Sequence, residues 1–147
     1  MEWGSGDDAG DLSSADGAGG SGRVLVIDDT EQIRHLIRVN LELEGYQVVE
    51  AVDGSDCLDR VLEVRPHVIT LDVVMPKLDG VETARRLRAD PRTTSIPIVL
   101  VTASAQQADL ELGRKVGVDA YVTKPFAPEH LVRVVKSLTD LASSPPA

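Results

Sequence analysis

Polar side chains suited to phosphoryl chemistry follow the apolar runs of this sequence, at the places where buried strands would end. They are Asp28, Asp29, Asp72, Thr102 and Lys124. Carboxylate oxygens are suitable ligands for Mg²⁺, and a carboxylate is also a nucleophile that can form an aspartyl phosphate. A hydroxyl and an ammonium supply the partners that the remaining phosphoryl oxygens need. Together these residue types indicate metal-assisted transfer of a phosphoryl group onto an aspartate.

Each of these residues has an ordinary structural alternative when it is taken alone. An acidic pair after a strand often begins a helix, and Asp29 or Thr30 also qualifies as an N-cap. A lone Asp72 suits a turn, Thr102 suits a helix cap, and Lys124 suits an exposed surface. The coincidence of all these residues at strand ends favours the functional interpretation.

Short β-branched runs alternate with helical patterns along the chain. The runs span 24–27, 48–49, 68–71, 98–101 and 120–122. The first, third and fourth are almost continuously apolar, as expected for strands buried on both faces. Strands that alternate with helices predict an α/β fold with a parallel sheet covered on both sides. Functional sites in such folds form at the carboxyl ends of the strands, so the polar residues should meet at one edge.

The helices between these strands are predicted from apolar residues at helical spacing. The stripes are Ile33, Leu36, Ile37 and Leu41; Leu58, Val61 and Leu62; Val81, Ala84 and Leu87; and Leu131, Val134, Val135 and Leu138. The segment 106–116 has the weakest pattern, because only Ala108 and Leu112 form its stripe and Gly113 lies inside it. Low local stability there would suit an element that moves.

The chain is predicted to hold one domain between two tails. It has 147 residues, which is an ordinary length for a single domain. Residues 1–22 are dominated by Gly, Ser, Asp and Ala, so we expect a disordered acidic tail, followed by a domain over 23–142 and a second disordered tail over 143–147. The lone Cys57 cannot form an internal disulfide, and we expect it to fill space in its helix.

Charge and hydropathy argue against nucleic-acid and membrane partners. The net charge is −9, whereas phosphate backbones require a basic surface. The apolar runs are far shorter than the about 20 residues that span a bilayer. The first residues contain no basic segment followed by an apolar one, so no signal peptide is expected and the predicted location is the cytoplasm.

Four short segments carry a resemblance to a known family. They are VIDD at 26–29, LDVVMPKLDG at 71–80, VTA at 101–103 and YVTKP at 121–125. With these segments the sequence resembles the receiver domain of bacterial two-component response regulators, in its stand-alone, chemotaxis-receiver-like form. The resemblance covers most of the predicted domain. It implies a doubly wound, flavodoxin-like fold of five parallel strands in the order 2-1-3-4-5 with five helices.

The resemblance also implies a role for each matching residue. Asp72 would be the phosphoacceptor, and Mg²⁺ would be held by Asp28, Asp29, Asp72 and the backbone carbonyl of Val74. Thr102 and Tyr121 would be the switch residues, Lys124 would pair with the phosphoryl group, and the Lys124–Pro125 peptide would be cis. Val74 and Ser104 stand at the variable positions near the site. Neither is an amide or an acid, so self-dephosphorylation is expected to be slow at most.

The predicted function is a phosphorylation-dependent switch in a two-component phosphorelay and not an enzyme. The phosphoryl donor would be a histidine kinase or a phosphotransfer protein. The output would be a protein target that binds the face formed by the helix 106–116 and Tyr121. A receiver-like scaffold that takes no phosphate remains the alternative. An aspartyl phosphatase would need a second acid at position 74, and a flavin-binding module would not place Asp28 and Asp29 against phosphate.

Overall fold

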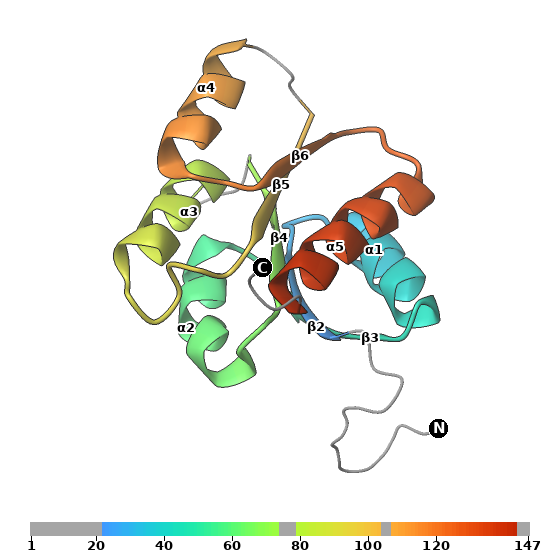
Figure 1. Ribbon diagram of the computed structural model, residues 1–147. Helices are drawn as coiled ribbons and strands as arrows, with labels where there is room; N and C mark the ends of the chain where they lie inside the picture. The colour runs from blue at the N-terminus through green and yellow to red at the C-terminus, as the bar shows by residue number, and fades with distance from the viewer. Residues whose placement is uncertain (1–21, 74–78, 104–106, 144–147) are drawn as a thin grey trace.

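The computed structural model describes residues 22–73, 79–103 and 107–143 (Figure 1). Apart from Gly22 and Ser143, the two predicted tails lie outside these residues. Within the described ranges the predicted alternation of strands and helices is present throughout. No helix there is long and apolar enough to cross a membrane.

Five parallel strands form a single sheet. They are β2 (Gly22–Ile27), β3 (Tyr46–Ala51), β4 (Val68–Asp72), β5 (Ile98–Thr102) and β6 (Ala120–Thr123). Their order is β3-β2-β4-β5-β6, which confirms the predicted 2-1-3-4-5 arrangement. The central strand, β4, is buried along its whole length, as its continuous apolar sequence predicts. The edge strand β3 is longer than the two valines that predicted it.

Helices cover both faces of the sheet. On one face lie α1 (Glu31–Leu43) and α5 (Pro128–Ser143), which pack side by side. On the other lie α2 (Gly54–Val64), α3 (Gly80–Ala89) and α4 (Gln107–Val116), each in contact with the next (Figure 1). This two-sided cover is the doubly wound architecture that the sequence predicts.

Each face of the sheet has its own hydrophobic core. Leu25, Ile69 and Leu100 belong to the core beneath α2, α3 and α4, whereas Val26 and Val99 belong to the core beneath α1 and α5. Cys57 is fully buried in the first of these cores, as expected of a space-filling residue.

Three residues of the predicted helical stripes are exposed instead of buried. Leu36, Leu62 and Leu112 keep 39%, 37% and 40% of their surface accessible. Successive helical residues are turned by about 100°, so a residue can match the spacing of a stripe and still face away from the sheet once the helix is packed. The buried positions of α1 are Ile37 and Leu41.

Candidate functional site

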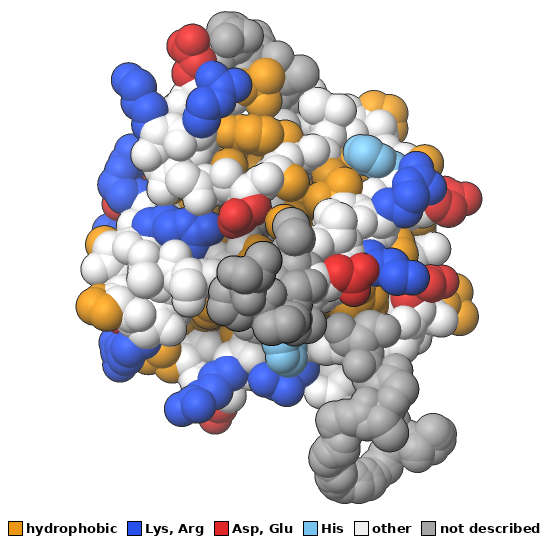
Figure 2. Space-filling view, viewed as in Figure 1, with side chains coloured by type: hydrophobic (Ala, Val, Ile, Leu, Met, Phe, Trp, Pro, Cys, Tyr) orange, Lys and Arg blue, Asp and Glu red, His pale blue; other side chains and the backbone are white. Residues whose placement is uncertain are grey.

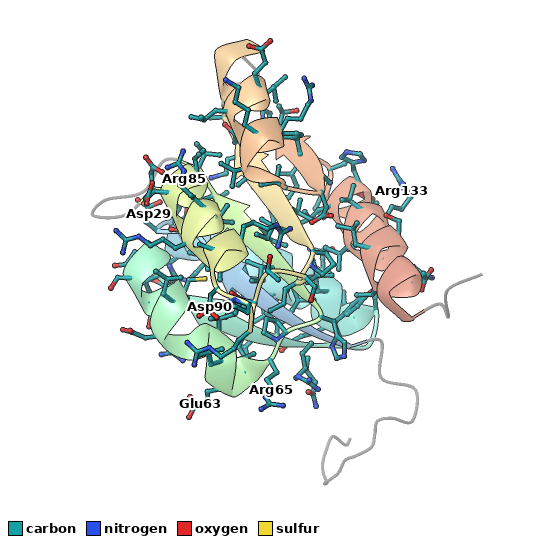
Figure 3. The ribbon with its side chains drawn as sticks, turned by 60° about the vertical axis from the view of Figure 1, so that its left-hand side comes forward. Asp29, Glu63, Arg65, Arg85, Asp90 and Arg133 are labelled. Atoms are coloured by element: carbon teal, nitrogen blue, oxygen red, sulfur yellow. The ribbon has the colours of Figure 1, made fainter. Side chains whose placement is uncertain are left out.

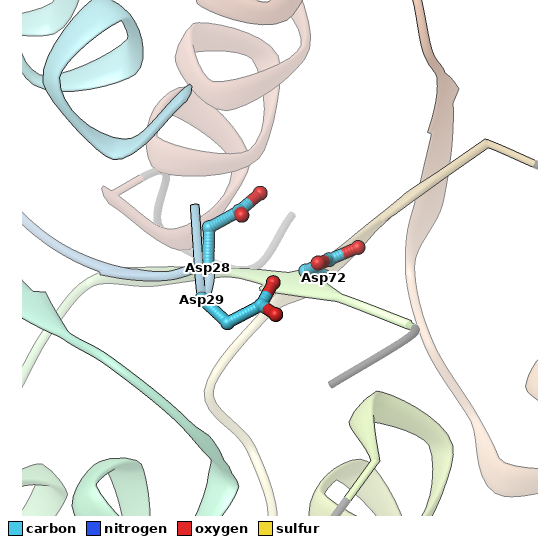
Figure 4. A group of neighbouring side chains, drawn as sticks. All are labelled: Asp28, Asp29 and Asp72. Atoms are coloured by element: carbon cyan, nitrogen blue, oxygen red, sulfur yellow. The ribbon is translucent and has the colours of Figure 1, made fainter. Parts of the chain in front are cut away.

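Three carboxylates meet at the carboxyl edge of the sheet. Asp28 and Asp29 follow β2, and Asp72 ends β4 beside it. One carboxylate oxygen from each lies within 4.8 Å of the others (Figure 4). Asp28 and Asp72 are buried, whereas Asp29 is exposed. In Figure 3 Asp29 lies at the left side of the molecule, apart from Arg65, which precedes β4 and lies at the bottom of the view. The predicted convergence of these three residues is present.

Asp28 is held by contacts at its side chain and its backbone. One carboxylate oxygen accepts a hydrogen bond from the Thr30 backbone N–H at 2.9 Å, and the other accepts from Lys124 Nζ at 3.0 Å. Thr30 occupies the N-cap position of α1 without a capping bond from its own side chain. The Asp28 carbonyl oxygen accepts from the Arg34 guanidinium at 2.8 Å. These contacts fix the carboxylate relative to α1 and to the end of β6.

Lys124 brings a positive charge to two of the three carboxylates. Its Nζ lies 3.0 Å from Asp28 and 3.4 Å from Asp72. Its backbone N–H donates to the Thr102 carbonyl oxygen at 2.7 Å, which joins the ends of β5 and β6. The Lys124–Pro125 peptide is cis, as the resemblance implies. Burial alone would lower the pKa of Lys124, but its hydrogen bond to Asp28 and the two carboxylate charges raise it, so the ammonium stays charged.

The surroundings of Asp72 disfavour the charged form of its carboxyl group. Burial, followed by the charge of Asp28, raises its pKa to about 6, and Lys124 offsets only part of this effect. Among the described residues, two buried carboxylates and one exposed carboxylate therefore share this edge with the Lys124 ammonium. A divalent cation would relieve the excess negative charge, and hard oxygen donors are the ligands that Mg²⁺ prefers. The residues present fit such an ion.

The two predicted switch residues lie on the face of the sheet that α4 covers. Thr102 is 2% exposed at the end of β5. Tyr121 pairs with Leu100 in the sheet and packs on the same core as that residue. Its hydroxyl donates to the Leu110 carbonyl oxygen of α4 at 2.7 Å. Because Leu100 and Thr102 are two residues apart on one strand, Tyr121 and Thr102 lie on the same face.

One predicted ligand falls outside the described part of the chain. The backbone carbonyl of Val74 lies in the range 74–78, and Ser104 lies in the range 104–106, so the structure describes neither. Ala103, which precedes Ser104, is exposed at the end of β5.

Two residues that the sequence analysis did not select also shape the site. Arg34 reaches the Asp28 carbonyl from α1 and forms an ion pair with Glu50 of β3 at 2.9 Å. Gly80 begins α3 against the phosphoacceptor candidate, where a Cβ atom would overlap the carbonyl oxygen of Asp72. No spacing signal marks Arg34. The position of Gly80 at the predicted start of a helix, next to the loop after Asp72, could have suggested the close approach.

The fold and the acidic edge together define the receiver class. The family model for the response regulator receiver domain matches residues 24–136, so the chain belongs to this family. Receiver domains are phosphoacceptors that bind Mg²⁺ in an acidic pocket, and the aspartate cluster described above could hold such an ion.

Curated relatives are similar over the receiver part. The chain is 41% identical over 116 residues to the DNA-binding dual master transcriptional regulator RpaA of Synechocystis, covering 79% of this chain and 48% of that protein. It is 40% identical over 116 residues to the alkaline phosphatase synthesis transcriptional regulatory protein PhoP of Bacillus subtilis, with the same coverage of 79% and 48%. The chain therefore spans about half the length of these relatives.

Solved receiver structures share the whole fold. The chemotaxis protein CheY4 of Vibrio cholerae matches with a TM-score of 0.76 and 31% identity, covering 79% of this chain and 97% of that one. The receiver domain of the Francisella response regulator 1452 matches with a TM-score of 0.77 and 30% identity, covering 83% and 99%. The chain thus carries a receiver domain of two-component signalling.

Proposed function

We propose that this receiver accepts a phosphoryl group on Asp72 and passes the signal on through protein contacts. The observation that carries the proposal is the convergence of Asp28, Asp29, Asp72 and Lys124 at one edge of the sheet. The donor would be a histidine kinase or a phosphotransfer protein, and Mg²⁺ would be the cofactor. This proposal is more specific than family membership, because it names the phosphoacceptor, the class of donor and the cofactor.

The proposed reaction is an in-line displacement at phosphorus. An oxygen of the Asp72 carboxylate forms the new P–O bond while the P–N bond to the donor histidine breaks, and the electron pair of that bond leaves with the imidazole. Asp28, Asp29 and Asp72 would hold Mg²⁺, which supplies charge neutralisation to the phosphoryl oxygens when bound. Lys124 supplies a fixed positive charge beside the acceptor oxygen, and Arg34 holds Asp28 in place through its carbonyl.

The proposed signal travels from Asp72 to the face formed by α4, β6 and α5. A phosphoryl group adds charge and acceptor oxygens, and the Thr102 hydroxyl and the Lys124 ammonium would be the groups that satisfy them. Movement of Thr102 makes room for Tyr121, which lies on the same face of the sheet. In Figure 2 hydrophobic side chains reach the surface over α4 and β6, and Leu112 is 40% exposed there. A protein target is the partner that such a surface suits.

The proposed phosphorylated state is long-lived, and the domain has no further catalytic role. An attacking water needs a group that orients it near the aspartyl phosphate. Val74 offers no side-chain hydrogen bond, and Ser104 offers only a single hydroxyl. Slow self-dephosphorylation is therefore the expected behaviour of this chain.

Labelling with a radioactive phosphohistidine donor in Mg²⁺ tests the proposal. Wild type should take up an acid-stable, alkali-labile label, and Asp72→Asn should abolish it. Asp59→Asn is the matched control, because Asp59 is an exposed aspartate of α2. Label that persists in Asp72→Asn would move the chemistry to another residue. No labelling of wild type by any donor would favour the scaffold alternative.

A further inference from the structure

The interior of α4 contains a buried glycine that helix formation alone would disfavour. Gly113 lies in the middle of Gln107–Val116 and is buried, whereas its neighbours Leu112 and Arg114 are exposed. Glycine inside a helix weakens it relative to alanine, because glycine loses more backbone entropy on folding. A buried glycine between two exposed neighbours therefore calls for a packing reason.

The packing reason is the hydroxyl of Tyr121. A Cβ atom at Gly113 would lie 2.5 Å from the Tyr121 hydroxyl oxygen, 3.0 Å from its Cε1 atom and 3.0 Å from a methyl group of Leu100. The Leu100 methyl can shift by a small rotation, whereas the rigid Tyr121 ring can give way only if the whole side chain swings about its bonds to Cα and Cβ. The tyrosine would have to leave its position, together with its hydrogen bond to Leu110 at 2.7 Å.

The hydrogen bond and the close approach involve the same turn of α4. Leu110 and Gly113 are three residues apart, so they are neighbours on one side of the helix. The Tyr121 hydroxyl donates to the first and lies against the second. Tyr121 therefore rests in a seat on α4 that consists of the Leu110 carbonyl and the bare Cα of Gly113.

We propose that Gly113 sets the resting position of the switch by making this seat for Tyr121. The proposal rests on the proposed function, in which phosphorylation of Asp72 draws Thr102 and then Tyr121 to a new arrangement. Gly113 touches no phosphoryl group, so it is a positioning residue that acts through Tyr121. The seat stabilises the resting arrangement and thereby opposes the phosphorylated one.

Linkage between the two arrangements gives the proposal a measurable consequence. A substitution that destabilises the seated arrangement alone shifts the population toward the arrangement that binds the phosphoryl group. Gly113→Ala should therefore raise the affinity for beryllofluoride, a phosphoryl mimic, in the presence of Mg²⁺. We expect a gain of at least threefold that disappears in a Tyr121→Ala background, where the seat has no occupant.

Folding stability supplies an independent readout. Where no clash opposes it, Gly→Ala inside a helix should raise the equilibrium constant for folding about fivefold. In the Tyr121→Ala background Gly113→Ala should show this stabilisation. In the wild-type background the clash should cancel or reverse it. Lys115→Ala, at an exposed position of α4, is the control for general effects on the helix.

The experiment is a double-mutant cycle of Gly113→Ala and Tyr121→Ala, measured by urea unfolding and by beryllofluoride titration. Equal stabilisation by Gly113→Ala in both backgrounds would overturn the seat. Coupling in stability with unchanged beryllofluoride affinity would reduce Gly113 to a packing residue and overturn its role in the switch. Failure of the wild-type protein to bind beryllofluoride would instead overturn the proposed function, and the role of Gly113 with it.

Discussion

The Lys124 ammonium lies closer to Asp28 than to Asp72, at 3.0 Å against 3.4 Å. In this arrangement the lysine neutralises the carboxylate that also accepts the Thr30 backbone N–H, and it leaves the Asp72 carboxyl with a pKa raised to about 6. The lysine thus competes with any cation for Asp28. It is also within reach of a group attached to Asp72.

Replacement of Lys124 by glutamine should tighten Mg²⁺ binding. The substitution removes a positive charge that repels the ion and occupies Asp28, so the affinity should rise about tenfold, the equivalent of about 1.4 kcal/mol. Isothermal titration of Mg²⁺ would measure the change. Lys136→Gln, at an exposed position of α5, is the matched control and should leave the affinity unchanged. Weaker binding by Lys124→Gln would show that the lysine supports the site instead of competing in it.

Replacement of Asp72 by asparagine should stabilise the protein when a chelator removes divalent ions. Because the pKa of Asp72 is raised to about 6 by burial and by Asp28, its charged form is disfavoured in the folded state, and this cost is present above pH 6. The free energy of unfolding of Asp72→Asn at pH 7.5 should therefore exceed that of wild type by about 1–2 kcal/mol. Urea unfolding would measure this difference.

The same measurement in Mg²⁺ should reverse the order of the two proteins. An ion that binds only the folded state stabilises it by mass action, and Asp72→Asn removes one of the ligands. Asp59→Asn should stay within about 0.5 kcal/mol of wild type in both conditions. A destabilised Asp72→Asn in chelator would contradict the electrostatic account of this edge.

The sequence predicted the fold well because the signals for the sheet are strong. Continuous β-branched runs predicted the central strands β4 and β5, and the topology of alternating elements then placed Asp28 and Asp72 at the same edge. The outer positions of helices were harder to predict. Leu36 matches the helical spacing of α1 as well as Ile37 does, but only tertiary packing decides which of them faces the sheet.

The sequence predicted those parts of the site that depend on the type of side chain. It did not predict the parts that depend on how closely atoms of different elements approach each other. Carboxylate, hydroxyl and ammonium groups at strand ends indicate their chemistry directly. Arg34 and Gly113 act through distances that the sequence does not encode locally: one reaches a backbone carbonyl of another element, and the other matters because it lacks an atom. The helix 106–116 was predicted as weak because of its thin apolar stripe and Gly113, and the structure shows what the glycine accommodates.

The amino end of the sheet should respond to pH through His67. Its Nδ1 accepts a hydrogen bond from the Arg23 backbone N–H at 2.9 Å, which requires the unprotonated nitrogen. Burial, followed by the positive charge of Arg23, lowers its pKa below the usual 6.5. The neutral form is thus favoured in the folded state, so this stabilisation is complete above about pH 6.5 and is lost as the pH falls through the lowered pKa.

Hydrogen exchange at the Arg23 amide would measure this effect. After correction for intrinsic rates, protection should be high at pH 7.5 and should fall by pH 5, and His67→Ala should remove the difference. The contribution to global stability is on the order of a few tenths of a kcal/mol, since the side chain is partly exposed. An imidazole that titrates at a higher pH in the folded protein than in urea would contradict the assigned direction.

The lifetime of the aspartyl phosphate should depend on position 74. Valine cannot orient water, so wild type should lose its phosphoryl group slowly, over many minutes in Mg²⁺ at neutral pH. Val74→Asn introduces an amide and should shorten the lifetime, whereas Val74→Ile should leave it unchanged. Decay of radioactive label would measure both. A wild-type lifetime of seconds that an amide at this position does not change would overturn the expectation.

Substitution of Thr102 should separate phosphorylation from its output, and the sheet offers a matched control. Thr102 of β5 pairs directly with Thr123 of β6, but Thr102 is 2% exposed whereas Thr123 is exposed to solvent. Thr102→Ala removes the hydroxyl that we propose contacts the phosphoryl group, and it leaves Asp72 and Lys124 unchanged in sequence. Labelling of Asp72 should persist, and the response at Tyr121 should be lost.

The response can be followed without knowledge of the partner. Tyr121 contacts α4 through its hydroxyl, so beryllofluoride in Mg²⁺ should shift the amide resonances of Leu110 and Gly113 in wild type and in Thr123→Ala. In Thr102→Ala these shifts should fall to a small fraction of their wild-type size, because no hydroxyl moves to make room for the Tyr121 ring. The resonances around Asp72 should still respond to the bound mimic. Full shifts at α4 in Thr102→Ala would mean that the signal reaches Tyr121 by a route that does not include Thr102.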